Sequence, residues 1–389
     1  MNSHPLELGP LRRAAFLTRP NRFLVRCRAG RLGVVEAALA NPGRMWELLF
    51  PGATLYLASA GDADTARSSP RKTKYTVVAV ERDGSPIFLH THLTNHVARW
   101  LIDRRRIPEL ARAQVVRSEV PAGKSRFDFL LQNGGRQMYL EVKSCTLFGN
   151  GVAMFPDAVT QRGRRHLLEL AAHVRPRARP WVLFLVHTPH VKWFMPDYHT
   201  DLAFSQTLLE VRKKINILPV AIQWNEDLSI AADVKTLDIP WAFLRREVKD
   251  RGGYLLIVRL LADKTVQIGR LGRLRFRRGY YIYVGSAMRN LSPRIARHMR
   301  TRKKLHWHID YLRQVADECV PLAIRSSARR ECEIAAALSK ILASGPKGFG
   351  SYDCDCPTHL FRHTGNPLEE SAFHRVLQRY RMRAPGEAG

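Results

Sequence analysis

Cysteine, acidic side chains and long apolar runs are all scarce in this 389-residue sequence. Its six cysteines are dispersed, so we do not expect the disulfide framework that holds small secreted domains together. No segment reaches the roughly 18 uninterrupted apolar residues of a membrane helix, and the N-terminus lacks a basic patch followed by an apolar stretch. We therefore expect a cytoplasmic protein that does not associate with membranes.

The shortage of acidic residues leaves a large positive charge. Lys and Arg number 63 against 34 Asp and Glu, a formal net charge of +29. A basic surface attracts polyanions, and nucleic acid, DNA or RNA, is the commonest of them. The alternative is a general preference for arginine in a GC-rich genome, which would raise the charge without building a binding groove.

Two segments in the first half of the chain form the most informative pattern. Ser125–Leu131 and Tyr139–Ser144 each resemble a strand, and Asn133, Gly134 and Gly135 between them suit a turn with positive φ. The pattern predicts a β-hairpin. The length of the chain and its 45% apolar content predict two or three domains with packed interiors.

The hairpin would bring together three charged side chains. Residues i and i+2 of a strand share a face, so Glu141 and Lys143 point the same way, and the returning strand places Asp128 alongside. Two carboxylates can hold Mg²⁺ or Mn²⁺, and an ammonium group beside them can orient water or stabilise phosphate charge. The alternative is the solvated face of an edge strand.

The segments SRFDFLL, EVKSCTL, FPDAVT and TQRGRRHLLEL, in that order from Ser125, closely resemble the sugar fermentation stimulation protein A (SfsA) family. The resemblance covers about Leu11 to Ile239. It implies an OB-fold joined to a PD-(D/E)XK nuclease-type core that binds DNA and acts as a DNA/RNA nuclease. It also implies Asp128, Glu141 and Lys143 as the metal and water site, with Glu119 as a further upstream acid.

Short strands with turn residues between them fill the N-terminal region and predict a small OB-like barrel. We expect strands at 22–28, 34–39, 54–58, 74–81 and 87–90, and a short helix at 44–49. Trp46 offers a stacking face for a base, or alternatively fills the barrel. A helix at 160–174 carries arginines in its first turns, where cations oppose the helix dipole and a phosphate ligand would explain them. The predicted nucleic-acid contacts of both regions are Arg22, Arg44, Arg71, Lys72, Arg162, Arg164 and Arg165.

A different pattern begins after Arg251. Strands are predicted at 254–258 and 279–285, followed by a basic helix at 292–302 capped by Ser292. The segments GYYIYVGSA, RIARH and HWHIDYL resemble the GIY-YIG superfamily, specifically its Uri-type branch, over about Gly253 to His363.

This second resemblance implies a nuclease-like site. Its tyrosines would be Tyr254 and Tyr283 and its phosphate arginine Arg294, and Arg297 on the same helix is predicted to contact nucleic acid. The carboxylate that holds a divalent metal is predicted to be Glu333, with Glu331 as the alternative.

Four possible zinc ligands lie near the C-terminus: Cys354, Cys356, His359 and His363. The Cys-x-Cys spacing differs from the Cys-x₂-Cys of zinc ribbons, although Uri-type relatives carry a similar segment. A Zn²⁺ site is therefore expected here, alongside Mg²⁺ or Mn²⁺ at the carboxylates.

Together these patterns predict an α/β multidomain protein. Its parts are an OB-like nucleic-acid-binding domain at 11–92, a PD-(D/E)XK-like nuclease core at 93–245, a GIY-YIG-like domain at 252–365 and a basic tail at 366–389. The predicted function is divalent-metal-dependent hydrolysis of DNA or RNA. The alternative is a non-catalytic DNA-binding regulator of sugar-utilisation genes on the same scaffold. No oligomeric state is specified.

Overall fold

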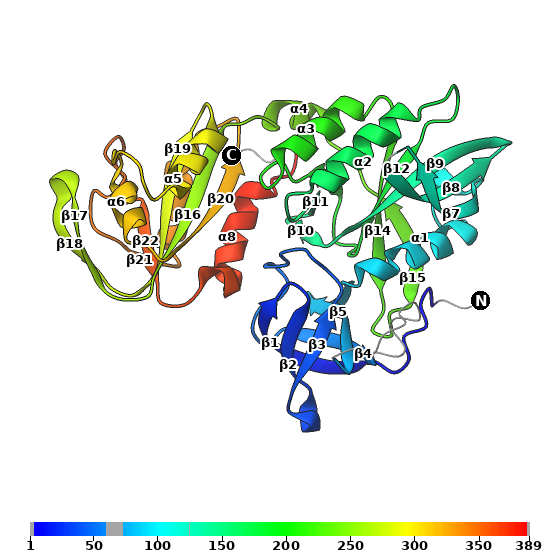
Figure 1. Cartoon of the computed structure of the whole chain (residues 1–389), viewed down its shortest axis with the longest axis horizontal. Helices are drawn as coiled ribbons and strands as arrows, with labels where there is room; N and C mark the ends of the chain where they lie inside the picture. The colour runs from blue at the N-terminus through cyan, green and yellow to red at the C-terminus, as the bar shows by residue number, and fades with distance from the viewer. Residues whose placement is uncertain (1–3, 60–72, 124, 387–389) are drawn as a thin grey trace. The chain divides into compact units, whose positions relative to one another are not determined.

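The computed structural model describes residues 4–59, 73–123 and 125–386, and the chain divides into two compact units (Figure 1). The first unit consists of Met1–Asp197 and Ala203–Pro240, and the second of Tyr198–Leu202 and Trp241–Gly389. In the described part of the chain, no helix is both long and apolar enough to cross a membrane.

The first unit begins with a closed β-barrel. Parallel pairing of β3 with β5 closes the sheet on itself, and β6 is added at the edge of β5. The predicted OB-like barrel is confirmed, although its first strand, β1, was not predicted. The strands are β1 (Arg12–Asn21), β2 (Leu24–Arg28), β3 (Val34–Leu39), β4 (Thr54–Ser59), β5 (Tyr75–Arg82) and β6 (Ser85–Phe88).

The helix predicted at 44–49 is wrong. These residues form a loop with a turn, and Met45 has a φ of 51°, which a right-handed helix does not permit. The segment between Gly43 and Gly52 is short and has little helical stability of its own, so tertiary packing decides its conformation. Met45 and Leu48 are buried instead in the apolar core.

The rest of the first unit is an α/β sandwich around a six-stranded mixed sheet of order β15-β14-β12-β9-β8-β7. A second, three-stranded sheet has the order β10-β11-β13. The elements are α1 (Thr94–Asp103), β7 (Gln114–Ala122), β8 (Ser125–Asn133), β9 (Arg136–Cys145), β10 (Leu147–Gly149), β11 (Val152–Phe155), α2 (Gln161–Ala172), β12 (Trp181–Val186), β13 (Trp193–Pro196), α3 (Leu202–Val211), β14 (Asn216–Trp224) and β15 (Ile230–Thr236).

The central strand β12 shows how the sheet is covered on both faces. Val182 and Phe184 pack in one apolar cluster with residues of α2 and α3, whereas Leu183 and Leu185 pack in another with residues of α1. This alternation is typical of a strand buried on both faces. On the neighbouring β9, Leu140 and Val142 belong to the α1 side, so Glu141 and Lys143 face α2.

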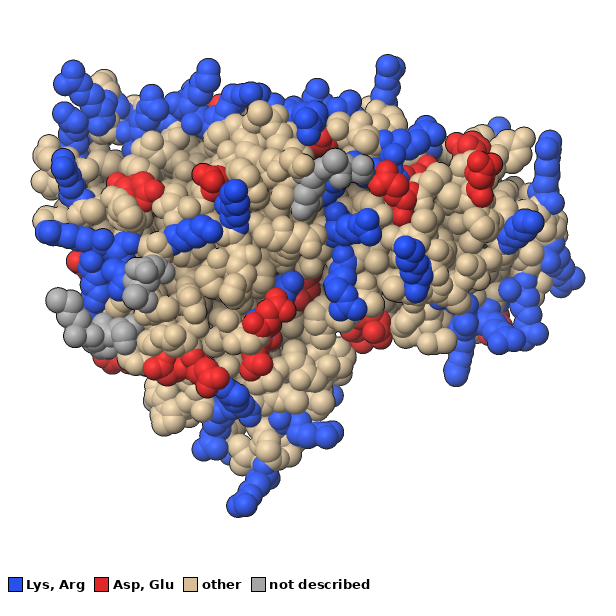
Figure 2. All heavy atoms as spheres, turned by 180° about the vertical axis from the view of Figure 1, so that it is seen from behind, with Lys and Arg blue, Asp and Glu red and all other residues tan. Residues whose placement is uncertain are grey.

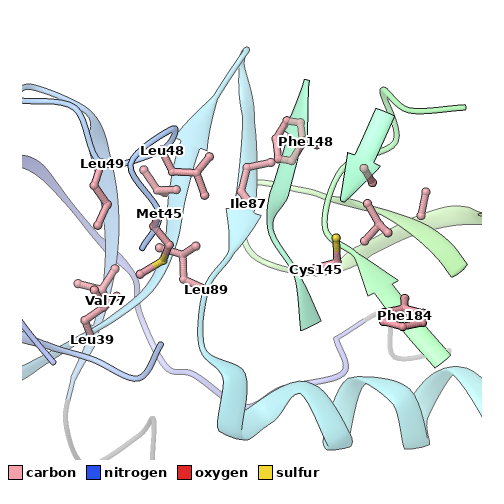
Figure 3. Packing of buried hydrophobic residues seen from close by; sticks show 14 of the residues in the cluster. Leu39, Met45, Leu48, Leu49, Val77, Ile87, Leu89, Cys145, Phe148 and Phe184 are labelled. Atoms are coloured by element: carbon pink, nitrogen blue, oxygen red, sulfur yellow. The ribbon is translucent and has the colours of Figure 1, made fainter. Parts of the chain in front are cut away.

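Barrel and sandwich share one apolar core within the first unit. Figure 3 shows residues from the barrel and its loop, such as Leu39, Met45 and Leu89, in the same cluster as Cys145 and Phe184 of the sandwich. Arg82 adds a polar link, because its guanidinium donates to the carbonyl of Phe148 at 3.0 Å. The barrel is therefore held firmly against the domain that carries the hairpin.

The second unit is built on an antiparallel five-stranded sheet of order β20-β16-β19-β22-β21. Its central strand β16 is buried along almost its whole length. The elements are α4 (Trp241–Glu247), β16 (Gly252–Leu260), β17 (Lys264–Ile268), β18 (Gly272–Phe276), β19 (Gly279–Ala287), α5 (Leu291–Met299), α6 (His308–Gln314), β20 (Glu318–Arg325), α7 (Glu331–Ser339), β21 (Ala343–Ser344), β22 (Leu360–His363) and α8 (Ser371–Arg381).

The basic helix α5 begins one residue before the predicted cap. Asn290 occupies the cap position, and the prediction that Ser292 caps the helix is wrong. The amide of Ser292 instead donates to Asp250, 3.0 Å from Oδ1 and 3.1 Å from Oδ2, and its hydroxyl donates to Oδ1 at 2.6 Å. The carboxylate of Asp250 thus accepts from a free amide at the helix start and interacts favourably with the helix dipole. Because Asp250 is distant in sequence, no local pattern could reveal this contact.

On the face seen in Figure 2, basic side chains are spread out rather than gathered in one stripe. Figure 2 shows Lys and Arg distributed across the visible face, with fewer Asp and Glu among them. Net charge alone therefore does not mark the binding surface, and the sites must be located from local geometry.

Candidate active site

Asp128 lies at the point where β8 and β9 separate. The pairing of the two strands runs from Phe129 and Leu140 to the turn, where Gly134 and Gly135 have the positive φ that the turn requires. The predicted hairpin is confirmed. Beyond Phe129, the carboxylate of Asp128 replaces a main-chain acceptor, because the amide of Val142 donates to its Oδ2 at 2.7 Å.

The strand also turns at this point. Phe127 packs in the α2-side cluster, whereas Phe129 packs in the α1-side cluster, although residues two apart on a regular strand share a face. The other oxygen of Asp128 accepts a hydrogen bond of 2.8 Å from Nδ2 of Asn95, in the first turn of α1. The carboxylate is thus fixed in place over β9.

Glu141 has one fully bonded oxygen and one without a donor. Its Oε1 accepts from Nδ1 of His166 at 2.5 Å and from Nζ of Lys143. Its Oε2 is buried, and no donor among the described residues contacts it. Because a buried carboxylate oxygen without a partner is costly, this atom marks where a hard cation would bind.

A second hydrogen bond determines which nitrogen of His166 carries the proton. Nε of Arg162 donates to Nε2 of His166 at 3.3 Å, so Nδ1 is protonated and donates to Glu141. The α2 helix that carries both residues begins after Thr160, whose hydroxyl caps it by accepting from the amide of Gly163 at 3.0 Å. Arg162 therefore supports the site through His166.

The two carboxylates have opposite pKa shifts. Burial, and then the charge of Glu141, raises the pKa of Asp128 to about 6. Burial alone would also raise the pKa of Glu141, but the hydrogen bonds from His166 and Lys143 outweigh it and lower that pKa. Two neighbouring carboxylates repel each other when both are ionised. A divalent cation bound between them would lower the free energy of the doubly ionised state.

The upstream acid lies elsewhere. Glu119 forms an ion pair of 2.9 Å with Arg126, in which both side chains are more than half exposed. The remaining predicted arginines of α2 are exposed: Nε of Arg164 donates to Thr207 at 3.1 Å, and Arg165 approaches Glu169 only to 3.9 Å. Arg71 and Lys72 lie outside the described residues.

A basic pocket of about 560 Å³ lies between the barrel and the sandwich. Arg44 stacks on Trp46 at 4.9 Å, and Arg19 donates from Nη1 to the carbonyls of Gly43 and Arg44, each at 2.8 Å, which holds the loop in place. The pocket is lined by Arg19, Asn21, Arg22, Pro42, Gly43, Arg44, Trp46, Ala158 and Val159. Of the arginines predicted in the barrel, the two that the structure describes, Arg22 and Arg44, therefore contribute to one pocket.

In the second unit, a buried hydrogen-bonded chain connects Tyr254 to a carboxylate. The hydroxyl of Tyr254 lies 3.0 Å from Nε2 of His298, whose Nδ1 lies 3.1 Å from Oδ1 of Asp310. Burial raises the pKa of Tyr254 well above its usual value, so the phenol is protonated and donates to His298. Tyr283 is buried beside it, with the two ring centroids 6.3 Å apart.

The arginines of α5 differ in their contacts. Arg294 and Arg297 stack on Trp307 at 4.8 Å and 4.3 Å. Arg297 also donates to both oxygens of Asp310 and, at 2.8 Å, to the carbonyl of Lys304. Its predicted contact with nucleic acid would therefore require it to leave several internal hydrogen bonds.

Glu331, rather than Glu333, lies beside the tyrosines. Glu333 is half exposed and accepts a hydrogen bond of 2.8 Å from Arg330. Glu331 is largely buried, and its charge acts on both Tyr254 and Tyr283. Residues two apart on a helix point in nearly opposite directions, so the choice between the two acids depends on how α7 packs.

Gly285 makes room for the phenol of Tyr254. A Cβ at this position would lie 2.5 Å from Cζ and from the hydroxyl oxygen of Tyr254. We expect Gly285→Ala to reduce the stability of the second unit by about 1–3 kcal/mol, measured by chemical denaturation. Gly253→Ala is the control, because its Cβ would lie 3.3 Å from the flexible end of Ile334 and should cost little. Equal effects of the two substitutions would contradict this packing.

Three cysteines and a histidine gather in the second unit. The ligand atoms of Cys332, Cys354, Cys356 and His359 all lie within 4.8 Å of one another, so the cluster could bind Zn²⁺. Tetrahedral Zn²⁺ with bonds of about 2.0–2.3 Å would need only a small further contraction. His363 is not part of the cluster, because its Nδ1 lies 2.9 Å from the carbonyl of Gly365, and Cys332 from α7 is the ligand that completes it.

Three important residues were not assigned to a site from the sequence: Asn95, His166 and Cys332. Each lies on a helix (α1, α2 or α7) that is separate from the strand or loop motif that it completes, so the spacing within the motif could not reveal it. His166 was visible only as one of several basic residues at the start of a helix. Its position four residues after Arg162, on the same face of α2, was the available signal.

Family models match three segments of the chain. An SfsA N-terminal OB domain matches residues 17–89, and a sugar fermentation stimulation protein RE domain matches residues 92–227. A domain of unknown function, DUF123, matches residues 253–382. The first two confirm the barrel and the restriction-endonuclease-like core, and the third corresponds to the α/β domain of the second unit.

Related proteins agree with these models. A sugar fermentation stimulation protein homolog of Chloroflexus aurantiacus is 41% identical over 209 residues, 54% of this chain and 78% of the relative. A homolog of Moorella thermoacetica is 42% identical over 200 residues, 51% of this chain and 83% of the relative.

A solved structure of an SfsA protein is similar to this chain in fold. Pyrococcus furiosus SfsA, determined in complex with Ca²⁺, superposes with a TM-score of 0.54 and 26% identity over 61% of this chain and 98% of that chain. The barrel, the mixed sheet and these relatives together show that the chain belongs to the sugar fermentation stimulation protein family, with a DUF123 domain after the family's OB and RE domains.

Proposed function

We propose that the first unit is a divalent-metal-dependent nuclease that hydrolyses phosphodiester bonds in DNA or RNA. The observation that carries this proposal is the buried Oε2 of Glu141, which has no donor among the described residues. It belongs to a carboxylate coupled to Asp128 and bonded to Lys143. This combination of groups is suited to a metal and a phosphate rather than to the stability of the fold.

Asp128 and Glu141 would hold the cation. Mg²⁺ or Mn²⁺ fits a pair of carboxylate oxygens, and the Ca²⁺ in the P. furiosus SfsA structure is likewise a cation that prefers oxygen ligands. Such a cation polarises the phosphoryl oxygen and promotes ionisation of a water. Asn95 and His166 keep the two carboxylates in the orientation that this requires.

Lys143 would act on the substrate itself. Its side chain is largely buried, and its ammonium group contacts Glu141 on the same strand, so it has little freedom to turn away. In that position it can orient the attacking water and stabilise the negative charge that develops on the phosphate. Arg165, exposed on α2, is available to contact a neighbouring phosphate.

The basic pocket would bind the strand away from the reaction. A base can stack on Trp46 while Arg22 and Arg44 contact phosphates, since aromatic and cationic groups together bind single strands without reading sequence. Ala158 and Val159 of the pocket directly precede Thr160 and α2, which carries His166. The pocket and the metal site therefore share one segment of chain.

Trp46→Ala is expected to weaken binding of single-stranded oligonucleotides by about 1–3 kcal/mol, roughly 5- to 150-fold in Kd. Binding is measured by fluorescence anisotropy without divalent metal, so that no cleavage occurs. Trp100→Ala is the matched control, because Arg104 stacks on Trp100 at 4.6 Å outside the pocket. A similar loss in both variants would exclude a specific role for Trp46.

For the second unit we propose a GIY-YIG-like site that acts on nucleic-acid phosphate. Tyr254, Tyr283 and Glu331 lie together, and Arg294 is near enough to lower the pKa of Tyr254 in part. The relay from Tyr254 through His298 to Asp310 would keep the phenol oriented. The cysteine cluster would hold Zn²⁺ in a structural role.

The proposed activity is tested by incubating the purified chain with labelled single-stranded DNA, duplex DNA, branched DNA and RNA. Each substrate is incubated with Mg²⁺, with Mn²⁺ and with EDTA. We expect metal-dependent cleavage products that EDTA abolishes. Binding without cleavage under every condition would reject the nuclease proposal and leave the DNA-binding regulator as the better description.

A further inference from the structure

Glu331 connects the cysteine cluster to the tyrosines of the second unit. It is the first residue of α7, and the next residue, Cys332, belongs to the cluster. Glu331 and Cys332 therefore both lie at the cysteine cluster. Glu331 is largely buried, with its side chain 13% exposed, so its two oxygens must be satisfied within the protein.

The ring of His359 lies between the cysteine cluster and Glu331, with one nitrogen facing each. Its Nε2 lies 3.4 Å from Sγ of Cys354, toward the cluster, and its Nδ1 lies 3.3 Å from Oε1 of Glu331. The ring is 1% exposed, so solvent does not compete for either nitrogen. A histidine that ligates a metal through one nitrogen commonly donates the other N–H to a carboxylate, which fixes the ring.

The second oxygen of Glu331 binds the sheet. The hydroxyl of Ser286 donates to Oε2 at 2.5 Å, and Ser286 lies on β19 three residues after Tyr283. On the neighbouring strand, Tyr254 is paired with Gly285. One carboxylate thus joins the cluster, the helix α7 and the strand that carries one of the two tyrosines.

We propose that Glu331 is a positioning residue for zinc: it orients His359 toward Zn²⁺ bound by Cys332, Cys354 and Cys356, and through Ser286 it transmits zinc binding to β19. This inference rests on the proposed zinc site. It differs from the role of catalytic metal ligand, since one oxygen of Glu331 accepts from Ser286 and the other lies 3.3 Å from Nδ1 of His359, a buried nitrogen with no other partner among the described residues. Zinc binding then determines the geometry around Tyr283.

Zinc affinity provides the test. Full-length wild-type protein and the variants Glu331→Gln and Glu333→Gln are titrated with Zn²⁺ in competition with a chromogenic chelator. A neutral amide holds the N–H of His359 less strongly, so Glu331→Gln should bind Zn²⁺ about 10- to 100-fold more weakly. Glu333→Gln is the matched control on the same helix and should retain wild-type affinity, because Glu333 contacts Arg330 instead.

The possible failures are distinguishable. Wild-type affinity in Glu331→Gln would overturn this inference while leaving the zinc site intact. If wild-type protein binds no Zn²⁺, or if Cys332→Ser binds Zn²⁺ as tightly as wild type, the zinc site itself is rejected. If Glu331→Gln does not fold, as judged by circular dichroism, Ser286→Ala takes its place and should weaken Zn²⁺ binding by a smaller but measurable factor.

Hydrogen exchange tests the transmission to the sheet. Removal of Zn²⁺ with a chelator should increase amide exchange in β19 around Tyr283 and Ser286, while β8 and β9 of the first unit remain unchanged. Unchanged exchange in β19 would overturn the proposed coupling, whatever the zinc affinity. Neither measurement depends on cleavage, so both stand apart from the nuclease proposal.

Discussion

Lys143→Ala is expected to reduce metal-dependent cleavage by a factor on the order of 10²–10⁴. The side chain of Lys143 is 17% exposed, and its ammonium group contacts Glu141 on the face of β9 that faces α2. Its loss would remove the group that orients water and stabilises phosphate charge. The two carboxylates would remain to bind the cation.

Binding of nucleic acid should survive this substitution nearly unchanged. We therefore expect anisotropy titrations of Lys143→Ala to give a Kd within about threefold of wild type, since one charge among many basic residues contributes little to the total. Lys213→Ala is the control, because Lys213 is an exposed lysine of the same unit, outside the site. It should retain full activity.

Two outcomes would contradict the proposal. Cleavage by Lys143→Ala at the wild-type rate would show that this lysine has no part in the reaction. Cleavage that persists in both Lys143→Ala and Asp128→Ala, but disappears in Tyr254→Phe, would move the activity to the second unit. Measurement of all three variants on one substrate separates these cases.

Asp128→Asn is expected to abolish cleavage and, without metal, to raise stability at neutral pH. Because the pKa of Asp128 is raised from 3.8 to about 6, the folded protein binds this proton more tightly than the unfolded chain does. Ionisation of Asp128 therefore costs stability, which falls as the pH rises from about 4 to about 6 and stays lower above that. A neutral amide side chain avoids this cost.

The gain should be at most about 3 kcal/mol, the value of a shift of two pKa units. The variant could keep both hydrogen bonds, since the introduced amide oxygen can accept from Val142 and Asn95 can turn its own oxygen toward the introduced NH₂ group. Thermal melts of wild type and Asp128→Asn are compared at pH 7.5 and pH 4, with EDTA and with Mg²⁺. The advantage of the variant should disappear at the lower pH.

Magnesium should act in the opposite direction. The cation stabilises the ionised pair, so it should raise the melting temperature of wild type but not that of Asp128→Asn. At limiting metal, the cleavage rate of wild type should also fall as the pH drops below about 6, because protonated Asp128 binds the cation poorly. A variant that is less stable than wild type at pH 7.5 in EDTA would disprove the electrostatic cost.

The central hairpin shows what local pattern can predict. Alternation in 125–131, the glycines at 134 and 135, and the two-residue spacing of Glu141 and Lys143 are short-range features, and each was confirmed in the strands β8 and β9. A strand repeats every two residues, so spacing alone assigns side chains to a face.

Short-range pattern failed where a contact came from far along the chain. The helix at 44–49 was a reasonable prediction from local residues, but Met45 adopts a positive φ and joins the core shared by barrel and sandwich. The carboxylate that accepts from the amide of Ser292 at the start of α5 belongs to Asp250, 42 residues away. Helix ends and short loops have little intrinsic preference, so tertiary packing determines them.

The sequence by itself determined the charge and the placement of two acids and a lysine on one hairpin, because these depend on composition and on the regular period of a strand. Its resemblance to the SfsA family added the barrel and the nuclease-like core. Tertiary structure alone decided that His166 and Asn95 hold the two carboxylates, that Glu331 rather than Glu333 lies beside the tyrosines, and that Cys332 rather than His363 belongs to the cysteine cluster. Hydrogen bonds and metal sites depend on distances of a few ångströms between helices and strands far apart in sequence, and only packing sets those distances.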